Sequence, residues 1–318
     1  LMDGRAEDIR PCILCHNGCF NMCHYKGVPN DQDLSDSLHL ARCAVNAEMM
    51  QWGKHHIDKT YSSKTVHIVG GGIGGMEAAR VLKLRGHKPV IHEKSNELGG
   101  AFIAASAESY KGKLRDLLAW YKRQMKELDI EVRLGDEVKD VSTFGGDPVI
   151  VATGAVPRVL RRVPGNEKMV EACDFLLGKK DVGETVAVIG GGLTGCEIAY
   201  ELALHGKKPI IVEMKDDLVA QKGVCLANSS YLREWFALNE VPVYLETALK
   251  EVKDGAIVCA GKDGSDFELA CDSVISCAGY IPAPLTEKRS GVQLIGDCRA
   301  VGNLRSVVWE AYEAAMKI

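Results

Sequence analysis

The sequence has little of what marks several common classes of protein. Aromatic residues make up only 6% of it, and no apolar run approaches the ~20 residues that a membrane-spanning helix needs, so no membrane partner is expected. The net charge is −4 and no basic stripe is present to neutralise phosphates, which excludes a nucleic-acid partner. No charged and then apolar signal opens the chain, and we expect a cytoplasmic protein.

Glycine and cysteine, in contrast, are plentiful, with 33 and 12 residues in a chain of 318. That length suits about two or three domains rather than one. Five cysteines fall within the first 43 residues, and we interpret the other seven, which are scattered, as buried inert thiols. Leu1 is not a start methionine and residues 4–10 read like the tail of a helix, so we expect a piece of a longer protein.

An internal repeat runs through the chain. The segment VHIVGGGIGG at residues 66–75 is similar to VAVIGGGLTG at residues 186–195, at an offset of 120 positions. Each copy predicts an apolar strand, a glycine-rich turn and a helix. A second apolar strand follows each helix and leads to an acid, Glu93 or Glu213, 23 positions after the first glycine of the turn.

The predicted helices complete the repeat. They cover residues 76–85 and 196–204, and each ends before a glycine, Gly86 or Gly206, that tolerates the left-handed conformation of a helix cap. An amphipathic helix and a further strand then follow in both halves. Strands that alternate with helices predict parallel βαβ units, and their duplication predicts an α/β protein with two Rossmann-like, doubly wound domains.

The glycines of each turn match the G-x-G-x-x-G pattern of a dinucleotide site. The first glycine of that pattern makes the tight turn, the second lets the backbone approach pyrophosphate, and the third lets helix and strand pack closely. One match alone is weak, since such turns also occur without a ligand, but two complete matches with their acids predict two nucleotide sites. The glycines are Gly70, Gly72 and Gly75 in the first copy and Gly190, Gly192 and Gly195 in the second.

The acid of the second copy bears on the choice of nicotinamide cofactor. The 2′-phosphate of NADPH would meet the Glu213 carboxylate with like-charge repulsion, whereas NADH offers a hydroxyl that the carboxylate can accept from. Lys215 lies two positions further on and softens that repulsion. The sequence therefore favours NADH and leaves NADPH as the alternative.

Three further segments resemble the FAD signatures of two-dinucleotide-binding flavoproteins of the disulfide-reductase type. They are ELGG at residues 97–100, VATG at 151–154 and LIGD at 294–297. The resemblance implies that the first repeat and the C-terminal tail bind FAD, with Asp297 near the ribityl chain, and that the second repeat is an inserted NAD domain. A strand-end cap is the alternative role of Asp297. No cysteine occurs between Val45 and Glu171, so a thioredoxin-reductase-like activity is not expected.

The predicted organisation follows from these segments. Residues 1–60 form a cysteine-rich segment and linker, residues 61–157 with 276–318 form the FAD-binding domain, and residues 158–275 form the NAD(H)-binding domain. No residue is assigned a catalytic acid–base role, because hydride transfer between stacked rings needs positioning rather than a general acid or base. Besides the glycines of the two turns, the candidate cofactor-binding residues are Glu93, Gly99, Gly100, Ala152, Thr153, Gly154, Glu213, Gly279, Gly296 and Asp297.

The N-terminal cysteines have the tight spacing of a metal cluster. Cys12-x2-Cys15-x3-Cys19 is followed later by Cys43, and thiolates are soft ligands that suit iron–sulfur clusters or zinc. Zinc fingers usually pair one C-x-x-C with a second similar pair, so this spacing favours iron and sulfur over zinc or a redox pair of Cys12 and Cys15. Two nearby histidines, His16 and His24, are interpreted as surface or supporting residues rather than ligands.

The same region resembles the segment that joins the halves of the 2,4-dienoyl-CoA reductase and enoate reductase family, old yellow enzyme-like NADH:flavin oxidoreductases with trimethylamine dehydrogenase as a relative. The similar residues are GRAEDIRPC at 4–12, with Cys15 and Cys19, and RCAVN at 42–46. In that family an N-terminal FMN barrel precedes a [4Fe–4S] cluster on four cysteines and an FAD/NAD(P)H module. The resemblance covers the whole chain, without the barrel.

The resemblance implies that the cluster ligands are Cys12, Cys15, Cys19 and Cys43. The spacing departs from the family at one point, since 23 residues separate Cys19 from Cys43, more than is usual there. A polar insertion around residues 26–37 accounts for the difference. Cys23 is the spare candidate for the fourth ligand.

The implied function is that of an electron-input module. NADH reduces FAD, and electrons pass through the [4Fe–4S] cluster to FMN in a barrel, attached in cis or carried by a partner flavoprotein. That barrel reduces an activated C=C bond of an enoate or enoyl-CoA. Two alternatives stay open: a non-catalytic module that holds ADP or FAD, as in trimethylamine dehydrogenase-like enzymes, and a free-standing NADH–acceptor oxidoreductase similar to the small subunit of glutamate synthase.

Overall fold

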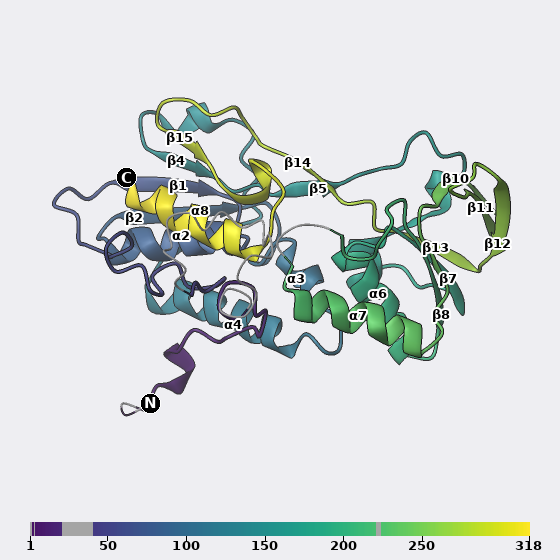
Figure 1. Cartoon of the computed structure of the whole chain (residues 1–318). Helices are drawn as coiled ribbons and strands as arrows, with labels where there is room; N and C mark the ends of the chain where they lie inside the picture. The colour runs from purple at the N-terminus through teal and green to yellow at the C-terminus, as the bar shows by residue number, and fades with distance from the viewer. Residues whose placement is uncertain (1, 3, 21–40, 221–223) are drawn as a thin grey trace.

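The structure, a computed structural model, describes residues 2, 4–20, 41–220 and 224–318. Cys23, His24 and the predicted polar insertion around residues 26–37 lie outside the described residues. Two α/β units lie side by side along the long direction of the molecule (Figure 1), and each is built on its own five-stranded sheet. None of the helices in the described part of the chain is both long and apolar enough to cross a bilayer.

The first unit is built on a parallel sheet with strand order β15-β4-β1-β2-β3. Its last strand in sequence, β15, lies at one edge beside β4, so the C-terminal part of the chain completes a sheet that the N-terminal half begins. The strands are β1 (Thr65–Val69), β2 (Lys88–Glu93), β3 (Glu131–Leu134), β4 (Val149–Val151) and β15 (Val292–Leu294), and the main helices are α2 (Ile73–Leu84), α4 (Gly112–Glu127) and α8 (Leu304–Met316).

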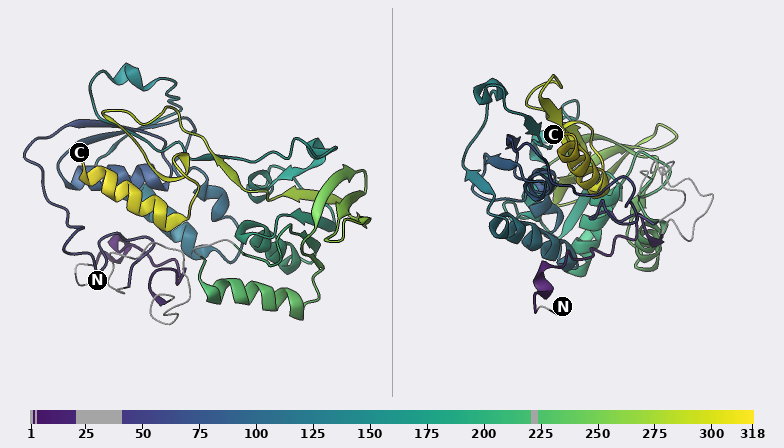
Figure 2. Two further views of the ribbon diagram at one scale, coloured as in Figure 1. Left: turned by 45° about the horizontal axis from the view of Figure 1, so that its top comes forward. Right: turned by 90° about the vertical axis from the view of Figure 1, so that its left-hand side faces the viewer.

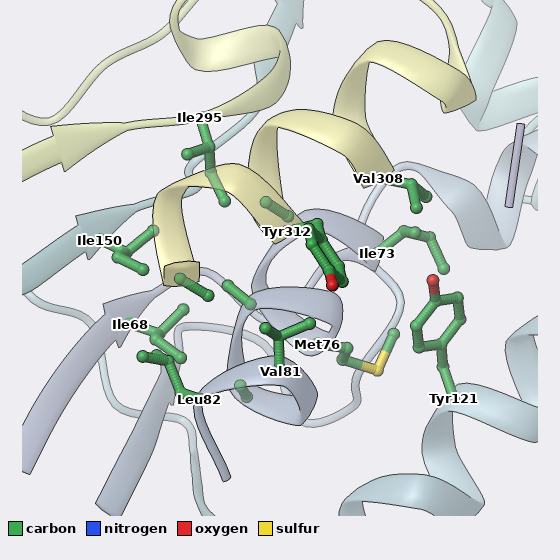
Figure 3. Packing of buried hydrophobic residues seen from close by; sticks show 14 of the residues in the cluster. Ile68, Ile73, Met76, Val81, Leu82, Tyr121, Ile150, Ile295, Val308 and Tyr312 are labelled. Carbon is green, nitrogen blue, oxygen red and sulfur yellow. The ribbon is translucent and has the colours of Figure 1, made fainter. Parts of the chain in front are cut away.

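Three helices bury one face of this sheet. Ile68 from β1 and Ile150 from β4 point toward Met76 of α2 and Tyr312 of α8 (Figure 3), and all four side chains are fully buried. Tyr121 of α4 closes the same core from the side. Burying a side chain of this size contributes ~1.5–3 kcal/mol, so the buried apolar residues of these strands hold the sheet under its helices.

The second unit repeats the plan with the parallel strand order β6-β13-β7-β8-β9. An antiparallel three-stranded sheet packs beside it, joined to it through buried residues such as Ile257 and Val274. The parallel strands are β6 (Val170–Glu171), β13 (Ser273–Ser276), β7 (Thr185–Ile189), β8 (Lys208–Val212) and β9 (Val243–Tyr244); the antiparallel ones are β10 (Ala248–Lys253), β11 (Ala256–Ala260) and β12 (Asp266–Ala270); the helices are α5 (Ala172–Leu176), α6 (Leu193–Leu204) and α7 (Leu226–Leu238).

Two short antiparallel strands connect the units. The chain leaves the first unit through β5 (Ala155–Pro157) and returns through β14 (Tyr280–Pro282), and the two pair with each other between the sheets (Figure 1). The second unit is therefore inserted into the first, and the predicted α/β fold with two Rossmann-like units is confirmed. The remaining elements are η1 (Ala6–Asp8), α3 (Phe102–Ala105), η2 (Val141–Phe144), η3 (Asn166–Lys168) and η4 (Gly296–Cys298).

The helix that follows each glycine turn starts earlier than the sequence predicts. Helix α2 begins at Ile73 rather than at residue 76, and α6 begins at Leu193 rather than at residue 196. The reason is that the third glycine of each turn lies inside the first helical turn, although glycine has a low helix propensity. The expected helix tail at residues 4–10 is only a short 3-10 turn, Ala6–Asp8.

Candidate dinucleotide sites and cysteine cluster

The first glycine turn has the geometry that pyrophosphate binding requires. Gly70 adopts a φ of 111°, in the region that favours glycine. A Cβ on Gly75 would collide with the carbonyl oxygen of Gly70, so only glycine lets helix α2 pack against β1 here. A Cβ on Gly72 would meet nothing closer than the Gly99 oxygen at 3.9 Å, which leaves open space in front of the helix N-terminus.

The acid at the end of β2 faces this turn. Glu93 is buried, and its carboxylate accepts hydrogen bonds from the backbone N–H groups of Gly71, at 2.6 Å, and Ser95, at 2.8 Å. Each carboxylate oxygen has two acceptor positions, so a further donor such as a ribose hydroxyl can still be accepted. The two backbone donors hold the side chain in place for that role.

The second turn has the same construction. Gly190 has a φ of 109°, and a Cβ on Gly195 would collide with the Gly190 carbonyl oxygen. Glu213, which follows β8, accepts hydrogen bonds from the backbone N–H groups of Gly191, at 2.6 Å, and Lys215, at 2.8 Å. The backbone of Lys215 thus helps to hold the Glu213 carboxylate in place.

The repeat extends beyond the turns into the segments that cover them. The N–H of Gly99 donates to the Gly71 carbonyl at 2.9 Å, and the N–H of Val219, 120 positions later, donates to the Gly191 carbonyl at 2.8 Å. Gly99 and Gly100 both have positive φ, and Gly100 lies directly against Gly72. The first site is therefore lined by a second pair of glycines, whereas the second has larger residues at those positions.

The candidate residues 152–154 follow β4 and come next to the first turn. The N–H of Ala152 donates to the Val69 carbonyl at 2.8 Å, and a Cβ on Gly70 would collide with the carbonyl oxygen of Ala152. The hydroxyl of Thr153 donates to the Ala283 carbonyl at 2.7 Å, which ties this strand end to the returning connection. Gly154 has a φ of 73°.

Gly296 and Asp297 follow the neighbouring edge strand β15, so they belong to the same end of the sheet. Gly296 has a φ of 62°, and its N–H donates to the Glu310 carboxylate of α8 at 2.9 Å. The half-buried Asp297 accepts a hydrogen bond from the Gly302 N–H at 3.0 Å through one carboxylate oxygen, which is the local capping role. Its other carboxylate oxygen does not take part in that bond.

Gly279 lies between strands β13 and β14, near the start of the segment 276–318 that the sequence assigns to the FAD-binding domain. It follows β13 with a φ of 87°, as Gly154 follows β4, and lines a small pocket beside the second glycine turn. Three other residues of this pocket were not predicted from the sequence: Glu171, Thr194 and Tyr280. The repeat gives a signal only for Gly279, because Cys277-Ala278-Gly279 follows its strand as Ala152-Thr153-Gly154 does.

The four N-terminal cysteines come together around Cys15. Burial raises the pKa of the Cys15 thiol to about 11, a neighbouring hydrogen bond from the Asn17 backbone opposes the rise, and the nearby thiols of Cys43, Cys19 and Cys12 add to it. The carbonyl of Cys15 also accepts a hydrogen bond from the Asn228 side chain of α7 at 3.3 Å.

Backbone contacts bring the two cysteine stretches together. The Arg42 N–H, directly before Cys43, donates to the Gly18 carbonyl, directly before Cys19, at 2.6 Å. A Cβ on Gly18 would collide with the carbonyl oxygen of Arg42, so a larger residue would separate the stretches. The backbone N–H of Leu14 points to the Cys12 sulfur at 3.4 Å, the kind of contact that stabilises a thiolate.

The thiols of Cys12, Cys19 and Cys43, which all act on that of Cys15, fit a soft metal or an iron–sulfur cluster in donor chemistry. Among the described residues, however, no group of three or more His, Cys, Asp or Glu side chains has the arrangement that holds a metal ion. The eleven cysteines of the described part of the chain are all free thiols. His16 is exposed and lies edge-on to Phe20, away from a ligand role.

The cysteines outside this cluster fit the predicted structural role. Five of the seven are buried, and Cys173 and Cys277 are half-buried. Burial raises the pKa of Cys196 to about 12 and of Cys259 to about 11, so these thiols stay protonated and unreactive near neutral pH.

The fold and the twin glycine turns define a two-dinucleotide oxidoreductase. Residues 64–303 match the model of the pyridine nucleotide-disulphide oxidoreductases, and the chain belongs to this family. It contributes the module of an NAD(P)H-dependent flavin oxidoreductase that binds FAD and a nicotinamide nucleotide.

Similar proteins include reductases of unsaturated compounds. A cinnamate reductase of Clostridium sporogenes is 34% identical and aligns with 100% of this chain and 47% of its own length. An NADH oxidase of Thermoanaerobacter brockii is 31% identical, over 99% of this chain and 49% of its own length. The solved 2-naphthoyl-CoA reductase complex aligns with 100% of this chain and 48% of its own length, with 26% identity and a TM-score of 0.87.

These relatives confirm the family resemblance stated from the sequence. The chain spans about half the length of the curated relatives it matches. A thioredoxin reductase of Lactococcus lactis shares the fold over 80% of this chain, with a TM-score of 0.66 and 22% identity.

Proposed function

We propose that this chain is the electron-input half of an enoate or enoyl-CoA reductase-like enzyme. In this function it takes electrons from NADH, passes them through FAD and a [4Fe–4S] cluster, and delivers them to an FMN barrel that reduces an activated C=C bond. One observation carries the proposal: two glycine turns of the same geometry each face an acid held by two backbone N–H groups.

The first unit is proposed to hold FAD. The turn at Gly70, Gly72 and Gly75 would hold the pyrophosphate, and Glu93 would accept the adenosine ribose hydroxyls. Strand ends β4 and β15 meet the same edge of the sheet, so the segments 152–154 and 296–297 are proposed to line the rest of the cofactor. Bound FAD supplies the chemistry of hydride acceptance and release of single electrons.

The second unit is proposed to hold NADH. Glu213 would accept the ribose hydroxyls and would repel a 2′-phosphate, while the pocket beside Gly279 lies at the other end of the same sheet edge. We keep the boundaries set by the sequence: an FAD-binding domain of residues 61–157 and 276–318, with an NAD(H)-binding domain of residues 158–275. The segment 1–60 would carry the cluster.

The cluster is proposed to bind to Cys12, Cys15, Cys19 and Cys43. The contact between Gly18 and Arg42 and the effect of the Cys43 thiol on the pKa of Cys15 support this set, because both require the two stretches to be close. Cys23 stays the alternative fourth ligand and lies outside the described residues.

The substrate class rests on the relatives. A cinnamate reductase and a 2-naphthoyl-CoA reductase both align with the whole of this chain, over 47% and 48% of their own length. We therefore assign the reduction of the organic substrate to an FMN barrel attached in cis, or to a partner flavoprotein, and not to residues of this chain.

An anaerobic absorbance titration of the purified chain tests the proposal. Flavin bands that bleach with one equivalent of NADH and need a large excess of NADPH are the expected result. A broad shoulder that persists after bleaching would be the expected mark of the cluster. A chain that is colourless, or that stays yellow with both nicotinamides after reconstitution with FAD, would contradict the electron-input function.

A further inference from the structure

Two tryptophans of the first unit hold the cysteine segment through their indole N–H groups. Trp120 of α4 donates to the Asp8 carbonyl at 2.9 Å, and Trp309 of α8 donates to the Cys43 carbonyl at 2.9 Å. Both rings are almost completely buried, at 5% and 7% exposure, where an indole N–H needs a partner. The N-terminal segment runs along these helices (Figure 2), so each bond joins it to the first unit.

An arginine from the cysteine segment stacks on each of these rings. The guanidinium carbon of Arg10 lies 4.6 Å from the centre of the Trp120 ring, and that of Arg42 lies 4.9 Å from the Trp309 ring. Arg10 stands two positions before Cys12, and Arg42 directly before Cys43. Each cysteine stretch is thus fastened by the same pair of contacts, a cation over an indole and the N–H of that indole to a backbone carbonyl.

Arg10 also joins both stretches to the helix of the first glycine turn. Its guanidinium donates to the Val45 carbonyl, two positions after Cys43, and to both carboxylate oxygens of Glu77 at 3.3 Å. Glu77 belongs to α2, is fully buried, and also binds Arg80. Burial opposes the ionisation of Glu77, but Arg80 and Arg10 outweigh it and hold the pKa of this carboxyl below its usual value.

A gain in packing energy alone does not account for these contacts. Burying a carboxylate with two guanidinium groups rarely adds net stability compared with an apolar core, so such a group is better understood as fixing one arrangement. Arginine, with its flat and forked guanidinium, can stack on a ring and bind a carbonyl and a carboxylate at once, whereas lysine cannot. The arrangement it fixes is the position of Cys12 and Cys43 relative to α2, α4 and α8.

We propose that Arg10 and Arg42 are positioning residues that set the placement of the cysteine cluster relative to the flavin-binding unit. They touch neither nucleotide site and act through Trp120 and Trp309. The consequence for electron transfer rests on the proposed function: the rate at which electrons leave the flavin for the cysteine-held group depends on them, whereas hydride transfer from NADH to the flavin does not.

The test compares Arg10→Gln, Arg10→Lys and Trp309→Phe with Arg133→Gln. Trp309→Phe keeps an apolar ring but lacks the N–H that reaches Cys43. Arg133 is an exposed arginine of the same unit, paired with Glu131 on the edge strand β3, and serves as the matched control. Two measurements apply to the full chain: hydrogen exchange of residues 4–20 and 41–52, and rapid mixing with NADH that follows flavin bleaching and the later reduction of the cluster.

Arg10→Gln and Trp309→Phe are expected to speed amide exchange in these two stretches by about tenfold, which corresponds to ~1.4 kcal/mol of local stability. Exchange in the second unit, the flavin content and the bleaching phase should stay as in the wild type, while the cluster phase slows. Arg10→Lys should recover part of the loss because it keeps the charge opposite Glu77. Arg133→Gln should change neither measurement.

A wild-type rate of the cluster phase in Arg10→Gln, with unchanged exchange at residues 4–20, would overturn the proposal. Equal slowing of both kinetic phases would overturn it as well, since this would indicate a general loss of structure. Failure of the proposed function is a separate result: a wild-type chain that takes up no iron and sulfide contradicts the electron path, and the exchange measurement still decides the positioning role because it needs no cluster.

Discussion

The backbone N–H of Gly71 lies 2.6 Å from a carboxylate oxygen of Glu93, and this one bond ties the glycine turn of the first unit to the end of the neighbouring strand. The second unit repeats it between Gly191 and Glu213 at the same distance. In each case the acid is held before any nucleotide arrives. A ribose hydroxyl therefore meets a fixed acceptor, and the ordering cost of the side chain does not reduce the affinity.

The two acids are expected to act on different cofactors. Glu213→Gln removes the charge of the second acid but keeps one carbonyl acceptor, so the affinity for NADH should fall about tenfold, or ~1.4 kcal/mol, in line with the loss of a charged hydrogen bond. Discrimination against NADPH should weaken because the repulsion of the 2′-phosphate is gone. Binding titrations with both nicotinamides and the flavin content check this.

Glu93→Gln is the matched variant for that experiment. It should lower the FAD content after purification and leave the affinity of the reconstituted chain for NADH unchanged. The assignment of the two units would be reversed if Glu213→Gln lost flavin and Glu93→Gln lost NADH binding.

The third glycine of each turn is expected to be intolerant of alanine. A Cβ on Gly75 or Gly195 would collide with a backbone carbonyl that cannot move without displacing its strand, so Gly75→Ala should lower the free energy of unfolding by ~3 kcal/mol. Denaturant unfolding measures this. Gly53→Ala is the control, because its added Cβ meets nothing within 4 Å. A stability of Gly75→Ala equal to that of the control would mean that the helix and strand are further apart than described.

A histidine pair, His92 buried and His67 half-buried, makes the stability of the first unit depend on pH. His67 lies 3.0 Å from His92, whose other ring nitrogen lies 2.8 Å from Asp136, and the ring of Phe144 stacks on His67 at 4.0 Å. Burial, then the charge of His92, lower the pKa of His67, and the nearby Asp147 only partly opposes this. The folded state therefore binds a proton at His67 less readily than the unfolded state does.

The sign of the effect follows from that difference. Where the unfolded chain binds more protons, stability rises with pH, so the contribution of His67 is present above about pH 6.5 and is lost as the pH falls through the lowered folded pKa. His67→Gln should flatten the decline in the free energy of unfolding between about pH 7 and 5. His56→Gln, an exposed histidine, should leave the slope unchanged. A steeper slope in His67→Gln would contradict the assignment.

Much of the fold could be predicted from the sequence because the same strand–turn–helix pattern occurs in both units. The strands before each glycine turn, the caps at Gly86 and Gly206, and the acids at Glu93 and Glu213 recur at one offset, and each is a local signal with one physical cause. The pocket at Glu171 and Tyr280 could not be predicted in this way, because Glu171 meets the end of β13, far from it in sequence, only through the pairing of β6 with β13. The indole bonds of Trp120 and Trp309 are equally non-local.

The choice between Cys43 and Cys23 as fourth ligand is open to a direct experiment. Cys43 is half-buried, its carbonyl is held by Trp309, and its thiol is close enough to raise the pKa of Cys15. Cys43→Ser is therefore expected to abolish the iron and acid-labile sulfide of the anaerobically reconstituted chain, and Cys23→Ser to retain them. Serine is a hard oxygen ligand that replaces a soft thiolate poorly.

Cys259→Ser, in the antiparallel sheet far from the segment in sequence, controls for the general effect of removing a thiol, and flavin content reports whether each variant folds. If Cys23→Ser loses the cluster while Cys43→Ser keeps it, the ligand set must be redrawn, and the Trp309 bond to Cys43 would then hold a neighbour of the cluster rather than a ligand. If all three variants keep their iron, the metal does not bind to this segment. Loss in Cys43→Ser alone would leave Cys12, Cys15, Cys19 and Cys43 as the one ligand set that accounts for both the spacing in the sequence and the contacts in the fold.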